Sequence, residues 1–167
     1  MTDKNEKGEY ALYDQGKLIG FAPVDYVDKV RVIASMKATL DQMKKQAKAD
    51  GVDLTLAAGL RTWGDQMYLR KLNVIDKAKA NDEKYLTEAP SNAFKPLTGK
   101  PGYSNHHDGL AYDFNVTGRP GVFEWLVKNA LRYGFVRTVP TERWHWEYLP
   151  AIKDMYHFVK QTDPSWA

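Results

Sequence analysis

The sequence predicts a single domain in which α-helices and β-strands are mixed, and three observations support this. Its 167 residues suffice for about one well-buried core, since domains typically hold roughly 100 to 150 residues. Apolar residues make up 43% of the chain and charged residues 27%, which is close to globular usage and argues against disordered or fibrous classes. Helical and two-residue hydrophobic periodicities both occur along the chain.

Two elements are expected before residue 50. Residues 9–22 place short apolar runs on either side of a turn at Gly16, which is typical of a β-hairpin. Over residues 27–49, apolar side chains recur at spacings of three and four, and this pattern predicts an amphipathic helix. Gly51 follows as its C-terminal cap, because glycine readily adopts the left-handed conformation needed there.

A strand and a second helix are expected next, and Arg61 lies at the junction between them. Residues 52–57 alternate apolar and polar side chains, as a half-buried strand does. Thr62 and Asp65 have the spacing of a capping box, which predicts the start of a helix that continues to Ile75. Functional groups are often presented by the loops between elements, so Arg61 is a candidate site residue.

A polar stretch opens the second half of the chain. Residues 81–105 are rich in Asn, Pro, Gly, Ser and Lys, and we expect a long surface loop there that could form a wall of a substrate site. Residues 110–116 then alternate and predict a strand, in which Asp113 shares a face with Ala111 and Asn115.

Three further elements complete the predicted order. A helix is expected over residues 120–134, with a proline at its start and a glycine at its end. Residues 144–148 alternate again, so His145 and Glu147 share one face of a strand. A last helix is predicted over residues 150–162.

Charge and composition exclude several classes of protein. The formal net charge is only +3, and no dense basic stripe occurs, so we expect no nucleic-acid partner. No window reaches the roughly 18 uninterrupted apolar residues of a membrane span, and the N-terminal residues lack the apolar core of a signal peptide. The chain has no cysteine, so any metal must be held by His, Asp or Glu.

Two short clusters, residues 104–113 and 142–147, hold three of the four histidines. A catalytic zinc site takes three nitrogen or oxygen ligands and leaves a fourth position for water. His106, Asp113 and His145 would supply such a set. A glycine between the first two permits a sharp turn, so a loop histidine can fold back beside the aspartate on the following strand.

Two more residues fit hydrolysis at such a metal. Glu142 lies three residues before His145, so its carboxylate could act as a general base without being a ligand. Arg61 offers a fixed charge and forked donors for an oxyanion or a substrate carboxylate. Each residue also has an ordinary interpretation: Glu142 as a surface charge, Arg61 as the partner of a nearby acid, and His106 as a loop histidine. We set His107 aside, because neighbours in an extended chain point apart and its side chain is expected to face solvent or to support a ligand.

Together the clusters form a paired motif, Ser104-x-His106-x-x-Gly109-x-Ala111-x-Asp113 followed by Glu142-x-x-His145. This motif resembles the signature of the zinc peptidases grouped with lysostaphin, the D-Ala-D-Ala metallopeptidases and hedgehog domains. Within that group the chain is most similar to VanY-type D,D-carboxypeptidases of vancomycin resistance. The resemblance covers roughly residues 50–150.

The resemblance implies a compact α+β domain, hedgehog- and DD-peptidase-like, with a central antiparallel sheet flanked by helices. It further implies one zinc ion on the three predicted ligands, Glu142 as the catalytic base and Arg61 as a contact to substrate or transition state. We expect Glu147 to orient a ligand histidine from outside the metal's own ligand set. The predicted substrate pocket contains Gln66, Ser104, Tyr103 and Trp144.

The implied substrates are peptidoglycan stem peptides, and the predicted activity is that of a D-alanyl-D-alanine carboxypeptidase. An L-Ala-D-Glu endopeptidase of the phage type remains an alternative, because Glu147 stands where many such carboxypeptidases carry a basic residue. Two further alternatives involve no hydrolysis. One is a non-haem iron enzyme, which binds its metal with two histidines and one carboxylate, and the other is a non-catalytic protein that binds the cell wall. We expect a monomer that acts in the periplasm or at the cell wall.

Overall fold

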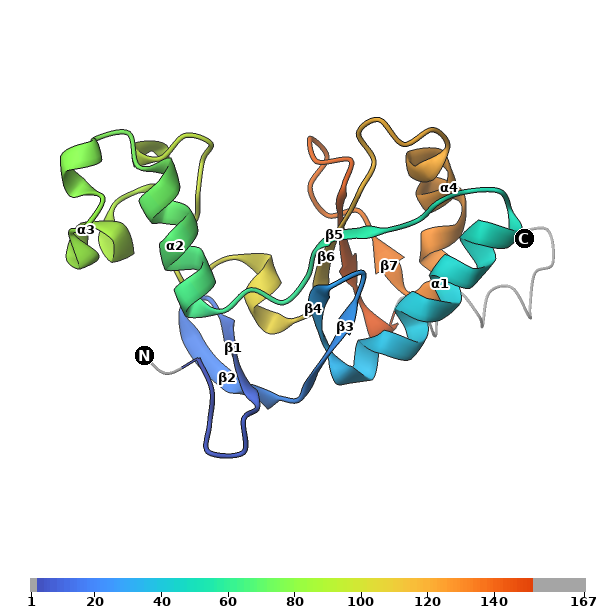
Figure 1. The fold of residues 1–167 in the computed structure, drawn as a ribbon, viewed down its shortest axis with the longest axis horizontal. Helices are drawn as coiled ribbons and strands as arrows, with labels where there is room; N and C mark the ends of the chain where they lie inside the picture. Colours follow the sequence, from blue (N-terminus) through green and yellow to red (C-terminus); the bar gives the residue numbers. More distant parts are fainter. Residues whose placement is uncertain (1–2, 152–167) are drawn as a thin grey trace. The chain divides into compact units, whose positions relative to one another are not determined.

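The computed structural model describes residues 3–151, and within it the chain folds as two compact units (Figure 1). Among the described residues, the first comprises 3–24 and 60–109, and the second comprises 25–59 and 110–151. Helices and antiparallel strands are mixed, which confirms the predicted fold class. The prediction of one zinc peptidase domain over the whole chain stays a prediction.

The first unit begins with the predicted hairpin. Strand β1 (Tyr10–Asp14) pairs antiparallel with β2 (Lys17–Ala22), and Asp14 lies opposite Lys17. The two residues between the strands both have positive φ, 47° at Gln15 and 78° at Gly16. This conformation matches the right-handed twist of paired strands and makes a tight two-residue turn possible.

Helix α2 (Trp63–Asn73) begins at the predicted capping box. The backbone N–H of Asp65 donates to the Thr62 hydroxyl over 3.0 Å, and the Asp65 carboxylate accepts the N–H of Thr62 over 2.9 Å. These bonds satisfy backbone donors that a helix start otherwise leaves unpaired. The sequence predicts that the helix continues to Ile75, but it ends two residues earlier, at Asn73, and the Ile75 side chain is exposed.

The predicted surface loop over residues 81–105 is more ordered than its composition indicates. It contains helix α3 (Glu83–Glu88), which Asp82 caps at its start, and several of its residues join a small apolar core. The buried members of this core are Val74, Leu86, Ala89 and Phe94. The polar composition of residues 81–105 does not indicate this packing, because a few apolar side chains at scattered positions suffice to bury a short helix.

The second unit is built on a four-stranded antiparallel sheet. Its strand order is β5 (Leu56–Ala58), β6 (Ala111–Phe114), β8 (His145–Tyr148) and β7 (Phe135–Val136). The three longer predicted strands are all present but shorter than expected. Antiparallel neighbours share a face at directly opposite positions, so this sheet aligns residues that are far apart in the sequence.

Helices α1 (Lys37–Ala49) and α4 (Val122–Asn129) lie beside this sheet (Figure 1), and most of their buried side chains are apolar. Helix α1 buries Leu40, Met43 and Ala47, and α4 buries Val122, Trp125, Leu126 and Asn129. After α4 a 3-10 helix, Ala130–Tyr133, leads to Gly134 with a φ of 89°. The predicted helix over residues 120–134 therefore exists, with a tighter last turn.

The predicted helix over residues 27–49 is wrong in its first half. Strands β3 (Val24–Val27) and β4 (Val30–Ile33) occupy that part of the chain and form a second hairpin. Its turn residues, Asp28 and Lys29, have φ values of 51° and 65°. The apolar residues here are mostly β-branched, and such residues favour strands even where their spacing suits a helix.

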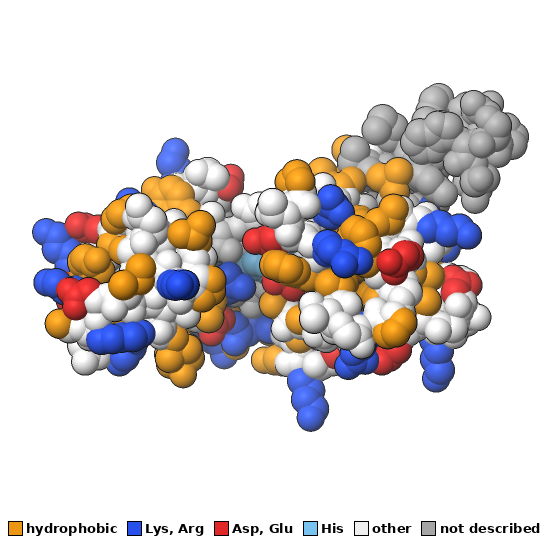
Figure 2. All heavy atoms as spheres, turned by 90° about the horizontal axis from the view of Figure 1, so that it is seen from above, with side chains coloured by type: hydrophobic (Ala, Val, Ile, Leu, Met, Phe, Trp, Pro, Cys, Tyr) orange, Lys and Arg blue, Asp and Glu red, His pale blue; other side chains and the backbone are white. Residues whose placement is uncertain are grey.

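No helix within residues 3–151 is long and apolar enough to cross a membrane. On the face drawn in Figure 2, basic side chains are interspersed with acidic and apolar ones and do not gather in one stripe. The helix predicted over residues 150–162 lies almost entirely outside the described residues.

Candidate functional site

In the second unit, Asp113 and His145 lie on neighbouring strands. Strands β6 and β8 pair so that Asp113 is directly opposite His145, and directly opposite residues project from the same face. The Nδ1 atom of His145 lies 3.0 Å from Oδ1 of Asp113. The His145 ring is buried, whereas the Asp113 side chain keeps 17% of its surface exposed. The sheet register thus unites two residues that are 32 positions apart.

Two glutamates lie close to the same imidazole. Oε2 of Glu142, in the loop before β8, is 3.9 Å from Nδ1 of His145, and Oε2 of Glu147 is 3.6 Å from Nε2. Glu147 also accepts a hydrogen bond from the Thr138 hydroxyl. Because Asp113 and Glu142 face one ring nitrogen and Glu147 the other, the histidine has a carboxylate on each side. The roles predicted for Glu142 as a base and for Glu147 as an orienting residue stay predictions.

The electrostatic surroundings of His145 attract positive charge. Burial by itself lowers the pKa of this imidazole, but the hydrogen bond that Asp113 accepts and the charges of Asp113, Glu147 and Glu142 outweigh it and raise the pKa. An environment that stabilises a proton on a histidine through three carboxylates also stabilises a divalent cation near it.

In the first unit, His106 lies on a short 3-10 helix, Asn105–Asp108. The Ser104 hydroxyl caps this helix by accepting the backbone N–H of His106 over 3.4 Å, and Gly109 ends it with a φ of 79°. The ring of His106 is almost fully buried. The predicted sharp turn at the glycine is therefore confirmed.

Arg61 is the centre of a polar network in the first unit. Its Nη1 donates to Oε1 of Gln66 over 3.2 Å and to Oγ of Ser104 over 3.4 Å. Gln66 is buried, and its Nε2 donates to the carbonyl of Gly99 over 2.8 Å. The structure thus brings together Arg61, Gln66 and Ser104, three residues predicted from sequence. Asp65, an acid close to Arg61 in the sequence, takes part in the capping box of α2.

Sequence reasoning missed His107, which is fully buried. Burial lowers the pKa of His107 to about 4, so the imidazole is neutral at neutral pH. Its Nδ1 lies 2.7 Å from the carbonyl oxygen of Arg61, and because a carbonyl can only accept, this nitrogen carries the proton. The N–H of Arg61 donates to the carbonyl of His106 over 3.1 Å. Both backbone polar groups of Arg61 are thereby fixed, and no local sequence pattern signals this.

Tyr103 and Trp144 are the most exposed of the predicted substrate-binding residues. Tyr103 exposes 51% of its surface and Trp144 exposes 41%. Both side chains are therefore accessible to a ligand, and their assignment to the substrate pocket stays a prediction.

Among residues 3–151, one group of His, Asp and Glu side chains could hold a metal ion, and it consists of His106, Asp113 and His145. This is the set that the motif predicts. It offers two imidazoles and one carboxylate, a ligand combination used by catalytic zinc sites.

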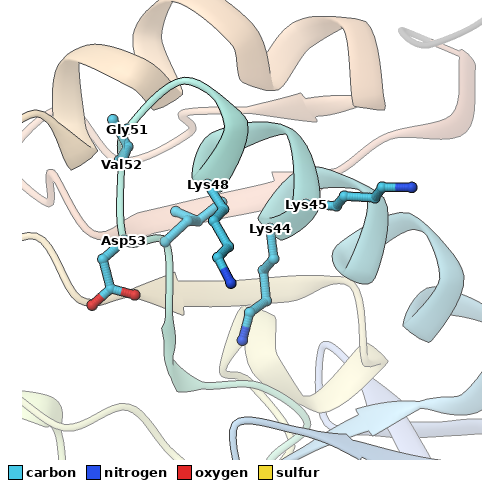
Figure 3. Close-up of a pocket in the computed structure, with 7 residues that line it drawn as sticks. Lys44, Lys45, Lys48, Gly51, Val52 and Asp53 are labelled. Atoms are coloured by element: carbon cyan, nitrogen blue, oxygen red, sulfur yellow. The ribbon is translucent and has the colours of Figure 1, made fainter.

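The second unit also has a hollow of about 580 Å³ (Figure 3). Its lining includes three lysines of α1 and the segment that follows the helix. In Figure 3 Lys44 and Lys48 point the same way while Lys45 points aside, and Lys44 is already paired with Asp28. None of the predicted site residues lines this hollow.

Comparison with known proteins places these residues in a family. The family model described as VanY, D-alanyl-D-alanine carboxypeptidase, matches residues 29–151. A D-alanyl-D-alanine carboxypeptidase of Enterococcus faecalis is 29% identical over 144 residues, which are 76% of this chain and 52% of the relative. The chain therefore spans about half the length of this curated relative.

Solved structures agree with that assignment. VanYB in complex with D-alanine-D-alanine is 27% identical with a TM-score of 0.65, and the match covers 88% of this chain and 91% of that one. A mutant of the vancomycin-resistance D,D-pentapeptidase VanY in complex with Zn(II) is 25% identical with a TM-score of 0.61, covering 94% and 92%. The LdcB LD-carboxypeptidase, 22% identical with a TM-score of 0.57 and a match over 83% and 68%, shares the fold. The chain belongs to the VanY D-alanyl-D-alanine carboxypeptidase family.

Proposed function

We propose that this chain is a zinc-dependent D-alanyl-D-alanine carboxypeptidase that removes the terminal D-Ala from peptidoglycan stem peptides. Family membership and the Enterococcus faecalis relative support the activity, and the related structure with D-alanine-D-alanine supports the substrate class. The observation that carries the proposal is the arrangement of Asp113, Glu142 and His145, in which a ligand pair has a further carboxylate beside it.

The residues present fit a zinc ion. Two ligands about 2.0–2.1 Å from one tetrahedral zinc lie roughly 3.3 Å apart, and Nδ1 of His145 and Oδ1 of Asp113 are separated by 3.0 Å. We assign His106, Asp113 and His145 as the ligands. Zinc in such a site would supply a Lewis acid that polarises carbonyl groups and lowers the pKa of bound water to about 7.

Glu142 is assigned as the general base and acid. Its carboxylate is part-exposed and lies 3.9 Å from Nδ1 of His145, and it would serve as a base without being a ligand. In this role Oε of Glu142 takes a proton from the attacking water and returns it to the nitrogen of the leaving D-Ala, so the amide C–N bond breaks and a C–O bond replaces it.

Arg61 is assigned as the substrate contact. A carboxypeptidase substrate ends in a carboxylate, and a guanidinium binds a carboxylate through two parallel donors. Gln66 and Ser104 accept hydrogen bonds from Nη1 of Arg61, which holds the guanidinium in one orientation. The same group could instead stabilise the oxyanion of the transition state.

Mass analysis of the products from a defined pentapeptide stem tests the proposal. Loss of one alanine identifies a carboxypeptidase. Release of a fragment cut between L-Ala and D-Glu would identify an endopeptidase instead, and unchanged peptide in the presence of bound zinc would identify a binder.

The base assignment is tested by Glu142→Gln, which keeps the size of the side chain and removes its basicity. We expect kcat to fall by at least about a hundredfold, with zinc content unchanged in elemental analysis. Glu88→Gln, at an exposed carboxylate on α3, is the matched control and should retain full activity. Full activity in Glu142→Gln would refute the assignment.

We also propose that the protein is a monomer that acts at the cell wall or in the periplasm, where its substrate lies. Light scattering coupled to size-exclusion chromatography should return a mass near 19.1 kDa. A mass near twice that value would contradict the monomer.

A further inference from the structure

The N-terminal hairpin lies before the residues that the family model matches, yet it contacts the loop that carries Tyr103 and Ser104. The hairpin turn is tied to this loop by a backbone hydrogen bond of 2.9 Å from the N–H of Gly16 to the carbonyl of Gly102. The family model begins only at residue 29. The hairpin therefore lies outside the region that the family model matches and contacts the loop of the predicted pocket residues Tyr103 and Ser104.

The backbone of Gly16 lies so close to the Tyr103 ring that a side chain at position 16 would clash with it. A Cβ atom placed on Gly16 would lie 2.7 Å from Cε2 of Tyr103 and 2.8 Å from its Cζ and Oη. A Cβ on Gly102 would lie 3.0 Å from Cα of Gly16 and 3.0 Å from the Trp63 ring. Only glycines permit this approach, and the tyrosine ring lies directly on the turn.

The strands of the hairpin also pack against the segments next to the loop that carries Tyr103 and Ser104. Tyr13, on β1, exposes only 3% of its surface. Its ring centroid is 5.4 Å from that of Trp63, at the start of α2, and 6.2 Å from that of His107. Aromatic pairs at these distances stabilise a fixed arrangement beyond simple burial. The hairpin is thus packed against the two segments from which Arg61 and Ser104 project.

We propose that this hairpin is a specificity-determining support of the substrate pocket, which fixes the position of Tyr103 and so sets how tightly the substrate peptide binds. The inference rests on the proposed function. Tyr103 is half exposed, so one part of its ring contacts the turn while another part remains open to the peptide. A displaced ring leaves the reacting groups in place and weakens recognition, so the expected change is in KM and not in kcat.

Gly16→Ala tests this proposal, and Gly8→Ala is its matched control. Both glycines have nearly the same left-handed backbone, with φ of 78° and 77°, so alanine causes similar strain at each. A Cβ on Gly8 meets nothing within 4 Å, so only Gly16→Ala displaces the ring. With a pentapeptide stem as substrate, we expect Gly16→Ala to raise KM roughly fivefold to tenfold with kcat within about twofold. Gly8→Ala should change neither constant.

A double-mutant cycle shows whether the effect passes through Tyr103. Tyr103→Ala leaves the turn intact and should itself raise KM, and Gly16→Ala added to it should have no further effect. Equal KM values for Gly16→Ala and Gly8→Ala, or additive effects in the cycle, would overturn the inference. If the wild-type protein cleaves no stem peptide, the proposed function fails first. The hairpin contact is then judged separately by the NMR shift of the Tyr103 ring, which should move in Gly16→Ala and not in Gly8→Ala.

Discussion

At the scale of single residues, the main finding is that Arg61 is held by its backbone as well as by its side chain. The sequence predicts Arg61 as a site residue, and the family resemblance adds Gln66 and Ser104 to that prediction. The sequence does not show that His107 is buried with its imidazole bonded to the Arg61 carbonyl over 2.7 Å. That contact joins residues 46 positions apart, and a histidine in a polar loop is more often exposed. Burial of this kind depends on tertiary packing, which local patterns do not encode.

Replacement of His107 by phenylalanine tests this support. The phenyl ring would fill a similar volume but could not donate to the Arg61 carbonyl, so a buried acceptor would lose its partner. We expect His107→Phe to lower the free energy of unfolding by about 1–3 kcal/mol and to lower kcat/KM, because Arg61 loses a fixed backbone. Urea titration and steady-state kinetics measure the two effects.

His107→Asn is the informative companion variant. An asparagine amide can place a donor near the position of Nδ1, so activity should be partly restored relative to His107→Phe, although the smaller side chain leaves a cavity. If both variants show the wild-type kcat/KM, the imidazole has no part in positioning Arg61.

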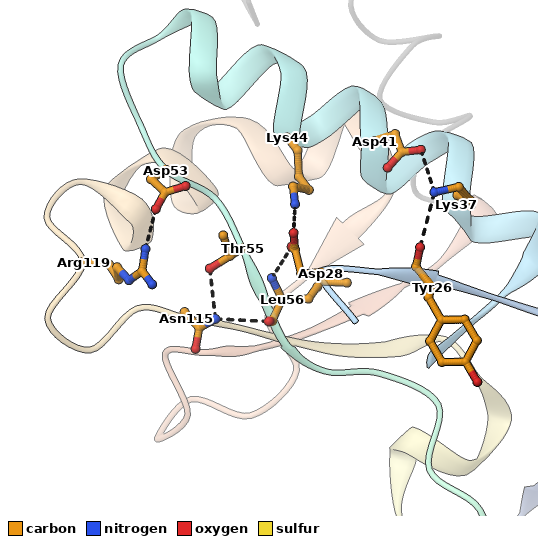
Figure 4. Close-up of polar contacts among 10 residues, drawn as sticks. All are labelled: Tyr26, Asp28, Lys37, Asp41, Lys44, Asp53, Thr55, Leu56, Asn115 and Arg119. Atoms are coloured by element: carbon orange, nitrogen blue, oxygen red, sulfur yellow. Dashed lines mark hydrogen bonds and ion pairs between the residues drawn. The ribbon is translucent and has the colours of Figure 1, made fainter. Parts of the chain in front are cut away.

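At the scale of elements, the sequence predicts helix starts and tight turns well, because these depend on neighbouring residues. The capping box at Thr62 and the turn at Gly16 are confirmed. The hairpin over residues 24–33 was missed because distant contacts stabilise it (Figure 4). Its turn residue Asp28 accepts the N–H of Leu56 over 2.9 Å and is paired with Lys44 of α1. Neither partner is near Asp28 in the chain.

The strand β5 is likewise held by side chains from remote segments. Nδ2 of Asn115 donates to Oγ1 of Thr55 over 2.9 Å and to the carbonyl of Leu56 over 3.1 Å, and Arg119 is paired with Asp53 (Figure 4). The alternating pattern of residues 52–57 predicts a longer strand, but regular pairing covers only Leu56–Ala58. In the first part of the predicted strand, the side-chain contacts of Asn115 and Arg119 accompany a single backbone bond, from the N–H of Asn115 to the carbonyl of Thr55 over 2.9 Å.

The capping box provides a prediction at this scale. Thr62→Ala removes the hydroxyl that accepts the N–H of Asp65, and loss of such a cap costs about 1 kcal/mol of stability. Helix α2 also carries Gln66 in its first turns, so kcat/KM should fall with it. The same substitution inside a helix, Thr39→Ala in α1, is the control and should be neutral or slightly stabilising, because alanine has the higher helix propensity. Equal stabilities of the two variants in thermal unfolding would contradict the role of the cap.

At the scale of the whole molecule, the small core under α3 shows how a polar segment becomes ordered. Arg70 of α2 is fully buried, its guanidinium lies 4.0 Å from the centroid of the Phe94 ring, and it donates to the carbonyl of Ala89. Burial lowers the pKa of this arginine. A buried cation joined to an aromatic ring and a backbone carbonyl explains why residues 81–105 do not form the open loop that their composition predicts.

The stability of the folded chain should depend on the metal. A ligand that binds only the native state at about 100 times its Kd stabilises it by about 2.7 kcal/mol. For a chain of this length each kcal/mol corresponds to a shift of roughly 2–4 °C in Tm. We therefore expect a chelator to lower the Tm of the zinc-loaded protein by roughly 5–10 °C, and added zinc to restore it.

Two variants make this prediction specific to the assigned ligands. His145→Ala removes a ligand and should abolish the response of Tm to the chelator, whereas Glu142→Gln removes only the base and should keep it. Elemental analysis of protein purified without added metal, with iron and zinc both measured, identifies the ion that the site selects. If the chelator leaves the wild-type Tm unchanged and the purified protein contains no zinc, the assignment of His106, Asp113 and His145 as zinc ligands is overturned. The two imidazoles and the carboxylate, with the carboxylate of Glu142 beside them, would then have a role other than metal-assisted hydrolysis.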